Sequence, residues 1–98
     1  MKRSRHIRPG AERDIAEAYR WYEEQRIGLG ADFLLCIEEG LAKIQRAPEA
    51  YPVVHKNVRR LLIKRFPYGM FYIIEIEAIV VLAVLHERRS PAVWQSRI

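Results

Sequence analysis

The apolar residues of this chain follow a helical period in its first half and a strand-like pattern in its second half. From residue 11 to residue 22 they recur three or four positions apart, which places them on one face of a helix. Pro9 and Gly10 lead into this stretch, and Glu12 and Asp14 suit the positive end of a helix dipole. The apolar stripe consists of Ala11, Ile15, Ala18, Tyr19 and Tyr22.

A second stripe with the same period follows a short interruption. Gly28 and Gly30 interrupt the helical pattern, because each glycine costs about 1 kcal/mol inside a helix. Pro48 prevents the second helix from continuing. Two amphipathic helices with so short a connection predict an antiparallel αα-hairpin. The second stripe consists of Phe33, Ile37, Leu41 and Ile44.

The rest of the chain is rich in β-branched and aromatic residues. Three segments, 58–66, 70–76 and 79–85, predict consecutive strands of an antiparallel meander. The last of them is apolar at every position, so we expect both of its faces to be covered. At the other end of the chain, residues 3–9 predict a short edge strand anchored by Ile7.

Together these elements predict one α+β domain over residues 1–98. The expected order is β-α-α-β-β-β, an antiparallel sheet with the αα-hairpin packed on one face. The opposite face should then be partly open. In a meander the end of the last strand lies near the start of the preceding one, so we expect residues 86–89 to lie close to residues 69–71.

Composition narrows the possible classes of protein. The chain has 98 residues, of which 50% are hydrophobic and 30% are charged, and its formal net charge is +5. The basic residues are concentrated toward the two ends of the chain, which favours an anionic or acidic macromolecular partner. A single cysteine, Cys36, excludes an internal disulfide, and no secretory signal or membrane-length apolar run is present. We therefore expect a cytoplasmic protein that does not associate with membranes.

The residues offer little that points to small-molecule chemistry. The three histidines and one cysteine lack the spacing of a metal site, and the "GLG" sequence at residues 28–30 lies between two helices rather than after a strand. We expect no metal, no cofactor and no small-molecule substrate. The segment "HERRSP" at residues 86–91 is the most distinctive, because it places two guanidinium groups directly after a buried strand.

These segments as an ordered set resemble the RelE/ParE family of toxins from type II toxin–antitoxin systems. The similarity lies in "ERDIAEAYRWYEEQRIGLGADFL", "PEAYPVVH", "VRRLLIKRFPYGMFY" and "IVVLAVLHERRSPAVW", and extends from about residue 7 to residue 94. The resemblance implies the fold predicted above. It also implies a cognate antitoxin protein as partner, and the apolar hairpin residues Tyr19, Tyr22, Phe33 and Ile37 are the expected antitoxin contacts.

The family divides by mechanism, and the sequence favours the ParE-like branch. RelE-like members cleave mRNA on the ribosome, which requires cations for the phosphorane and an acid–base pair. By this resemblance, Met70 or one of its neighbours in "GMFY" stands where that branch has an arginine after the "PYG"-like turn, and Trp94 stands where it has a tyrosine. Neither a thioether nor an indole replaces those groups. If the chain were nonetheless an endoribonuclease, Arg88, His86, Lys64 and Arg65 would be its candidate catalytic residues.

The resulting hypothesis is a ParE-like toxin that inhibits DNA gyrase by binding and is neutralised by an antitoxin. Two alternatives remain: a ribosome-dependent mRNA endoribonuclease, and an inactive toxin fold that binds only the antitoxin. The expected target-binding residues are Arg59, Arg60, Arg65, Arg88, Arg89 and Trp94.

Overall fold

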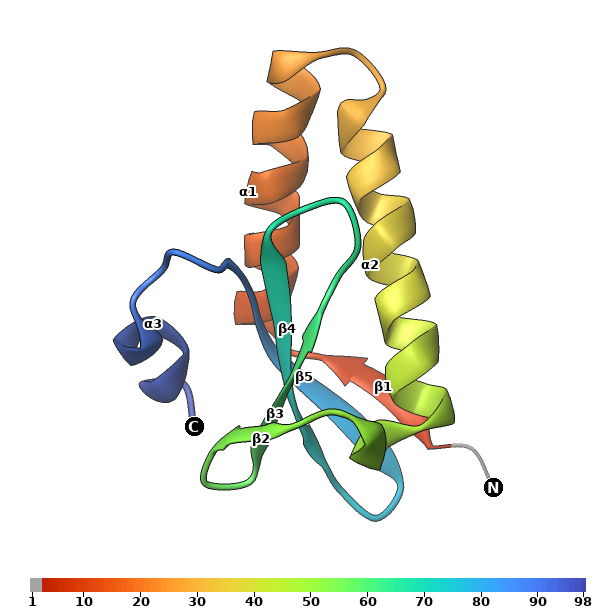
Figure 1. The fold of residues 1–98 in the computed structure, drawn as a ribbon, viewed down its shortest axis with the longest axis vertical. Coiled ribbons are helices and arrows are strands. Elements are labelled where there is room, and N and C mark those ends of the chain that lie inside the picture. The colour runs from red at the N-terminus through yellow and green to blue at the C-terminus, as the bar shows by residue number, and fades with distance from the viewer. Residues whose placement is uncertain (1–2) are drawn as a thin grey trace.

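Two long helices form the hairpin that the sequence predicts. The computed structural model describes residues 3–98, and in it α1 (Pro9–Gln25) and α2 (Leu29–Arg46) stand side by side and extend past the sheet (Figure 1). The connection turns at Gly28, whose φ of +92° is accessible to glycine at little cost. The Glu23 carboxylate accepts hydrogen bonds from the backbone N–H groups of Gly28 and Gly30, both at 3.0 Å, and so fixes the start of α2.

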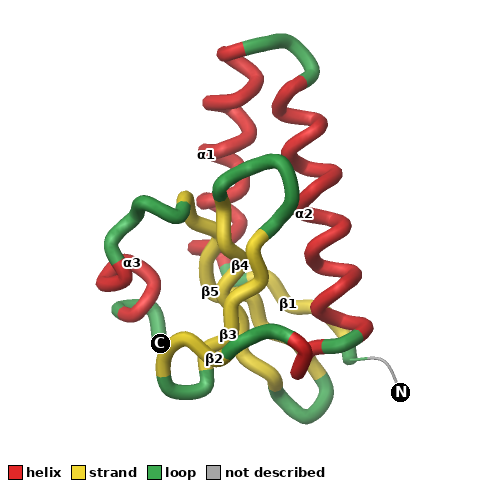
Figure 2. Tube along the Cα trace, in the orientation of Figure 1, coloured by secondary structure: helices red, strands yellow, loops and turns green. Residues whose placement is uncertain are grey.

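The strands form a single five-stranded sheet in the order β1-β5-β4-β3-β2 (Figure 2). Strands β2 to β5 are antiparallel to their neighbours, whereas β1 pairs with β5 in parallel. A 3₁₀ turn, η1, joins α2 to β2, and a short helix, α3, follows β5. The bounds are β1 (Ser4–Ile7), η1 (Pro48–Ala50), β2 (Val53–His55), β3 (Val58–Leu62), β4 (Tyr68–Ile74), β5 (Ala78–His86) and α3 (Pro91–Gln95).

The predicted α+β architecture is confirmed, and the structure differs from the prediction in three details. The sheet is mixed rather than wholly antiparallel, because the N-terminal strand lies beside the last strand and runs in the same direction. The short strand β2 lengthens the meander at its other edge. The helix α3 lies apart from the hairpin, beside the end of β5 (Figure 1), so the face expected to be open is partly covered.

Hydrophobic side chains pack on both faces of the sheet. The helical stripes meet the larger cluster, in which Phe33 and Ile44 are completely buried against residues such as Met70 and Tyr72. On the opposite face, Trp94 of α3 packs with Phe71, Leu82 and Leu85. Every side chain of β5 from Ile79 to Leu85 is buried, which confirms that this strand is covered on both sides.

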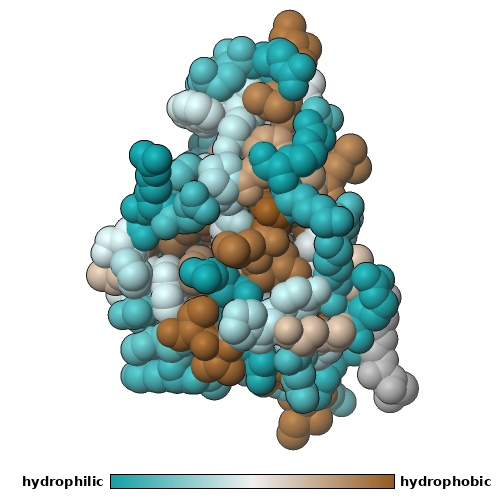
Figure 3. Space-filling view, viewed as in Figure 1, coloured by the Kyte–Doolittle hydropathy of each residue, from teal (hydrophilic) through white to brown (hydrophobic). Residues whose placement is uncertain are grey.

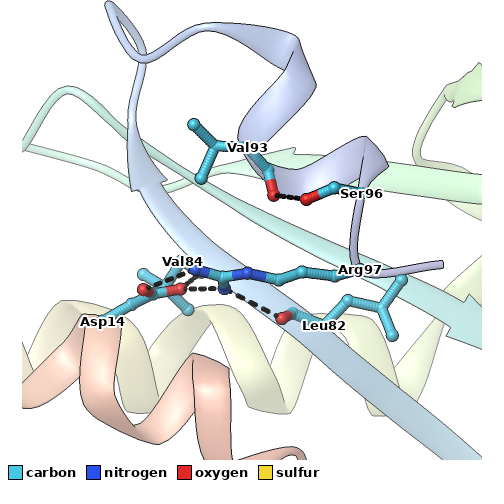
Figure 4. Close-up of polar contacts among 6 residues, drawn as sticks. All are labelled: Asp14, Leu82, Val84, Val93, Ser96 and Arg97. Atoms are coloured by element: carbon cyan, nitrogen blue, oxygen red, sulfur yellow. Dashed lines mark hydrogen bonds and ion pairs between the residues drawn. The ribbon is translucent and has the colours of Figure 1, made fainter.

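An ion pair provides hydrogen-bond partners for the backbone of β5 where this strand extends beyond β1. The register between β4 and β5 shifts at a bulge, and past it β5 has no strand neighbour on the β1 side. There Asp14 accepts a hydrogen bond from the Val84 N–H at 3.0 Å, and Arg97 donates to the Leu82 carbonyl at 3.3 Å (Figure 4). The two side chains also pair with each other, at 2.6 and 3.1 Å. This arrangement, the Asp14–Arg97 latch, ties the C-terminal segment to α1 and to the exposed edge of β5.

No helix in the described part of the chain is both long and apolar enough to span a membrane.

Candidate binding site at the end of β5

The end of β5 lies against the β3–β4 turn, as the sequence predicts. His86 pairs with Tyr68, and the Glu87 N–H donates to the Pro67 carbonyl at 2.8 Å. The chain then turns, because the Arg89 N–H donates to the His86 carbonyl at 2.9 Å and the Arg88 N–H donates to His86 Nδ1 at 3.0 Å. This turn holds the backbone of both arginines while their side chains remain exposed.

The arginines and lysine expected at this site are not equally available. Arg59 donates to the carbonyls of Glu49 and Tyr51, at 3.2 and 2.7 Å, and therefore stabilises the β2 region. Arg65 pairs with Asp32 on α2 at 3.4 Å, and Lys64 approaches Glu39 on the same helix at 3.9 Å. The guanidinium of Arg59 is therefore committed to the fold, and its contact with a target stays a prediction.

Three guanidinium groups remain available around the end of β5: Arg60, Arg88 and Arg89. No side-chain hydrogen bond or ion pair joins any of them to another described residue. We call Arg60, Arg88 and Arg89 the cationic rim. Within the cationic rim, Arg60 belongs to β3, whereas Arg88 and Arg89 belong to the turn after β5.

Trp94 does not belong to the exposed surface. Its side chain is only 6% exposed, and its ring stacks on Phe71 with centroids 4.6 Å apart. In this structure the indole anchors α3 to the sheet, and contact of Trp94 with a target stays a prediction. The tryptophan that is exposed is Trp21, which lies outside the apolar stripe of α1.

Two cavities flank the end of β5, one on each face of the sheet, and Arg89 lines both of them. The cavity on the hairpin side has a volume of about 190 Å³ and includes Asp14, Glu17 and Trp21 of α1. The cavity on the α3 side has a volume of about 90 Å³ and includes Arg60 and Glu87. A partner that reached either cavity would therefore meet a rim guanidinium.

The comparisons with known proteins agree with this architecture. A family model described as "ParE toxin of type II toxin-antitoxin system, parDE" matches residues 6–91. The chain belongs to the ParE toxin family. Toxin ParE2 from two strains of Mycobacterium tuberculosis, CDC 1551 / Oshkosh and ATCC 25618 / H37Rv, is 27% identical over 99 residues, covering 100% of this chain and 94% of the relative.

A solved structure has the same fold. A chain of the "Chromosomal ParDE TA system from P. aeruginosa" superposes with a TM-score of 0.77 at 18% sequence identity, covering 87% of this chain and 96% of the other. The RelE/ParE resemblance and the preference for the ParE-like branch are thus confirmed at the level of family and fold.

The candidate catalytic residues of this ParE-family chain lie in the β3–β4 turn and at or just after the end of β5, and several of them have partners within the fold. Lys64 and Arg65 pair with carboxylates of α2, while His86 uses its Nδ1 to accept the Arg88 N–H. Burial raises the pKa of Tyr68, the tyrosine whose ring contacts His86, so its hydroxyl stays protonated at neutral pH. Met70 is completely buried on the hairpin face.

The described residues also contain no group of three His, Cys, Asp or Glu side chains arranged to hold a metal ion.

The hairpin residues expected to contact an antitoxin lie mostly inside this ParE fold. Phe33 and Ile37 are buried in the core, and Tyr22 stacks on Phe33 with centroids 5.4 Å apart. Tyr19 is half-buried against Gly30, where an added Cβ would lie 2.8 Å from its ring. Phe33 and Ile37 hold the hairpin on the sheet, because their side chains pack in the core rather than on its outer face, and their contact with an antitoxin stays a prediction.

Other apolar side chains of the hairpin do reach the surface. Ile27, in the turn, is 92% exposed, and Figure 3 shows hydrophobic side chains at the tip of the hairpin. Trp21, Leu34 and Leu35 are also exposed on the two helices. The sequence contains a signal for them, since all four fall outside the helical stripes that predict the core.

Proposed function

We propose that this ParE-family toxin inhibits DNA gyrase by binding to it in the cytoplasm, without a catalytic centre of its own. The observation that carries the proposal is the cationic rim. Three guanidinium groups lie around the end of one buried strand, and none has an internal carboxylate partner among the described residues. Guanidinium groups form strong bidentate contacts with carboxylates and phosphates, so a rim of this kind suits a macromolecular target.

The rigidity of the rim adds to its suitability for binding. Arg88 and Arg89 follow a strand that is buried on both faces, and their backbone is held by two hydrogen bonds from the turn at His86. Binding therefore costs little ordering of the backbone, and the entropy lost is mainly that of the side chains. An enzyme would need a paired acid and base, and the contacts of Lys64, Arg65 and His86 form no such pair: the first two face carboxylates of α2, and His86 accepts the Arg88 N–H.

We further propose that a cognate antitoxin neutralises the toxin by covering exposed apolar residues of the hairpin. Trp21, Ile27, Leu34 and Leu35 are large hydrophobic side chains on a small surface, and such exposure is typical of a protein interaction site. The similar solved structure comes from a ParDE TA system, which agrees with an antitoxin partner for this chain. Tyr19 and Tyr22 would contribute only through their exposed edges.

A supercoiling assay tests the gyrase proposal. We expect the purified chain to inhibit supercoiling by gyrase, and the double variant Arg88→Gln, Arg89→Gln to require a concentration about tenfold higher, because charged interface contacts are lost. The matched control is Arg26→Gln, Arg46→Gln, which removes two exposed charges from the hairpin instead. Equal loss in both double variants would show a nonspecific charge effect and would refute the role of the rim.

A translation extract supplies the other arm of this test. Cleavage of mRNA that is lost in Arg88→Ala would favour the endoribonuclease alternative. Inactivity in both assays, with antitoxin binding retained, would favour the inactive module. Inhibition of gyrase with intact mRNA supports the proposal.

A further inference from the structure

Arg60 differs from every other arginine described in this chain. Its Nε is buried and has no hydrogen-bond acceptor among the described residues. A buried donor of a charged group is costly to leave unpaired, and such groups in proteins normally have a partner. Arg60 therefore carries a positive charge that has no partner among the described residues, and its side chain lines a cavity that opens beside it.

The sheet holds this guanidinium in one place. Arg60 lies on β3 opposite Phe71 of β4, and its stem crosses over the neighbouring Gly69. A Cβ at Gly69 would lie 3.1 Å from Arg60 Cδ and 3.2 Å from Cγ, so the absence of a side chain there provides the space that the stem occupies. A stem confined in this way loses little further entropy when the guanidinium binds a ligand.

Arg60 lines the 90 Å³ cavity on the α3 side of the sheet. Arg89 provides a second guanidinium, and Glu87 provides a carboxylate, so the charged groups of the lining sum to one positive charge. The stacked rings of Phe71 and Trp94 form apolar walls. The volume corresponds to roughly three water-sized groups, which is the size of the carbon and two oxygens of a carboxylate.

From these features we infer that the cavity is a carboxylate site, and that it takes an aspartate or glutamate side chain from a protein partner. The inference rests on the proposed function and deepens it, since it names the chemistry by which one part of the cationic rim binds its target. The net charge of the lining matches a monoanion, and the planar fork of Arg60 matches two carboxylate oxygens. The partner residue would enter past Leu62 and Pro91 and offer its oxygens to the guanidinium nitrogens of Arg60 that face the cavity.

A nucleic-acid phosphate fits this cavity less well. Single-stranded nucleic acid is normally held by ring faces on which bases stack, and here the faces of Phe71 and Trp94 are buried against each other. A polyanion would also meet Glu87 in the lining. We therefore commit to a protein carboxylate and make the phosphate an outcome of the test.

The test is a nuclear magnetic resonance titration of the full chain, observed at the arginine Nε–H groups. The probes are N-acetylglutamate amide, its neutral analogue N-acetylglutamine amide, and dimethyl phosphate, all at constant ionic strength. We expect the acid to shift the Arg60 Nε–H signal saturably and to bind roughly tenfold more tightly than the neutral amide. The Arg88 signal should move little, since Arg88 does not line the cavity.

Two variants complete the design. In Arg60→Lys, which keeps the charge and loses the fork, we expect the acid no longer to perturb the Gly69 amide, while Arg88→Gln should respond like the parent chain. Equal shifts at Arg60 and Arg88, or equal affinity for acid and amide, would overturn the carboxylate site. Tighter binding of dimethyl phosphate than of the acid would replace it with a phosphate site. Since neither gyrase nor antitoxin is present, this result is independent of the supercoiling assay.

Discussion

Removal of Asp14 tests whether the latch between α1 and the C-terminal segment stabilises the fold. The Asp14 carboxylate accepts three hydrogen bonds, from Arg97 Nη1 at 2.6 Å, Arg97 Nη2 at 3.1 Å and the Val84 N–H at 3.0 Å. Its side chain is only 10% exposed, and that of Arg97 is 28% exposed. The hydrogen bond to Asp14 also raises the pKa of Arg97, so this guanidinium remains charged.

The structure sets the expected size of the effect. Leaving one buried N–H unpaired costs about 1–3 kcal/mol. Breaking a buried ion pair by removing one partner costs about 3–5 kcal/mol, and the partial exposure of Arg97 lowers that figure because water reaches the freed guanidinium. For Asp14→Ala we therefore expect a loss of about 2–3 kcal/mol in the free energy of unfolding, and for Arg97→Ala about 2 kcal/mol.

Equilibrium unfolding in urea, followed by far-ultraviolet circular dichroism, measures these values. The double variant should reveal a coupling energy of about 1–2 kcal/mol between the two side chains. Glu39→Ala serves as control, because Glu39 meets Lys43 and Lys64 only at the surface and should cost less than about 1 kcal/mol. A coupling energy below about 0.5 kcal/mol, or equal losses in Asp14→Ala and Glu39→Ala, would show that the latch does not stabilise the fold.

Three further changes test the packing of the sheet. Tyr72→Phe removes a hydroxyl that donates to the Pro48 carbonyl at 2.6 Å and should cost about 1 kcal/mol in urea unfolding. Burial raises the pKa of Tyr72 from 10.0 to about 12, so the stability that its neutral hydroxyl provides is complete below pH 10 and is lost as the pH rises toward 12. The free energy of unfolding of Tyr72→Phe should therefore fall less than that of the parent chain over this pH range. Gly40→Ala places a Cβ 2.8 Å from the sulfur of buried Met70 and should cost about 1–2 kcal/mol by the same assay, whereas an unchanged midpoint would contradict that contact. Trp94→Phe should remove the blue-shifted part of the fluorescence, since Trp94 is buried and the other tryptophan is exposed.

Most of the fold follows from periodicity, and the exceptions have local causes. The stripes from Ala11 to Tyr22 and from Phe33 to Ile44 identify the buried faces of both helices, because helix burial follows a simple period. Strand β2 has only three residues, too few for an alternation to be recognised. Helix α3 is too short for a periodic pattern, but it has a local signal: Ser90 caps it, accepting the Ala92 N–H at 3.3 Å, and Pro91 occupies the first turn.

The candidate site was predictable in position and less so in composition. A buried strand followed by Arg88 and Arg89 places two guanidinium groups at the edge of a sheet, and pairing in the meander brings them near Gly69. Sequence alone does not distinguish a free arginine from a committed one: Arg59 and Arg60 are adjacent, yet one binds backbone carbonyls and the other lines a cavity. That difference arises because successive side chains of a strand point to opposite faces.

The latch shows most clearly what a local pattern leaves out. Asp14 reads from the sequence as a residue that favours the start of a helix, but its carboxylate binds Arg97, 83 positions away, and the edge of β5. The same contact has a consequence for the site. Arg97 lies two residues after the end of α3. The α3 residues Pro91 and Trp94 form part of the wall of the Arg60 cavity. Loosening the latch would free this wall, so the proposed carboxylate site should weaken in Arg97→Ala although Arg97 does not line it. If the site bound equally well without the latch, the stacking of Trp94 on Phe71 would alone suffice to hold α3.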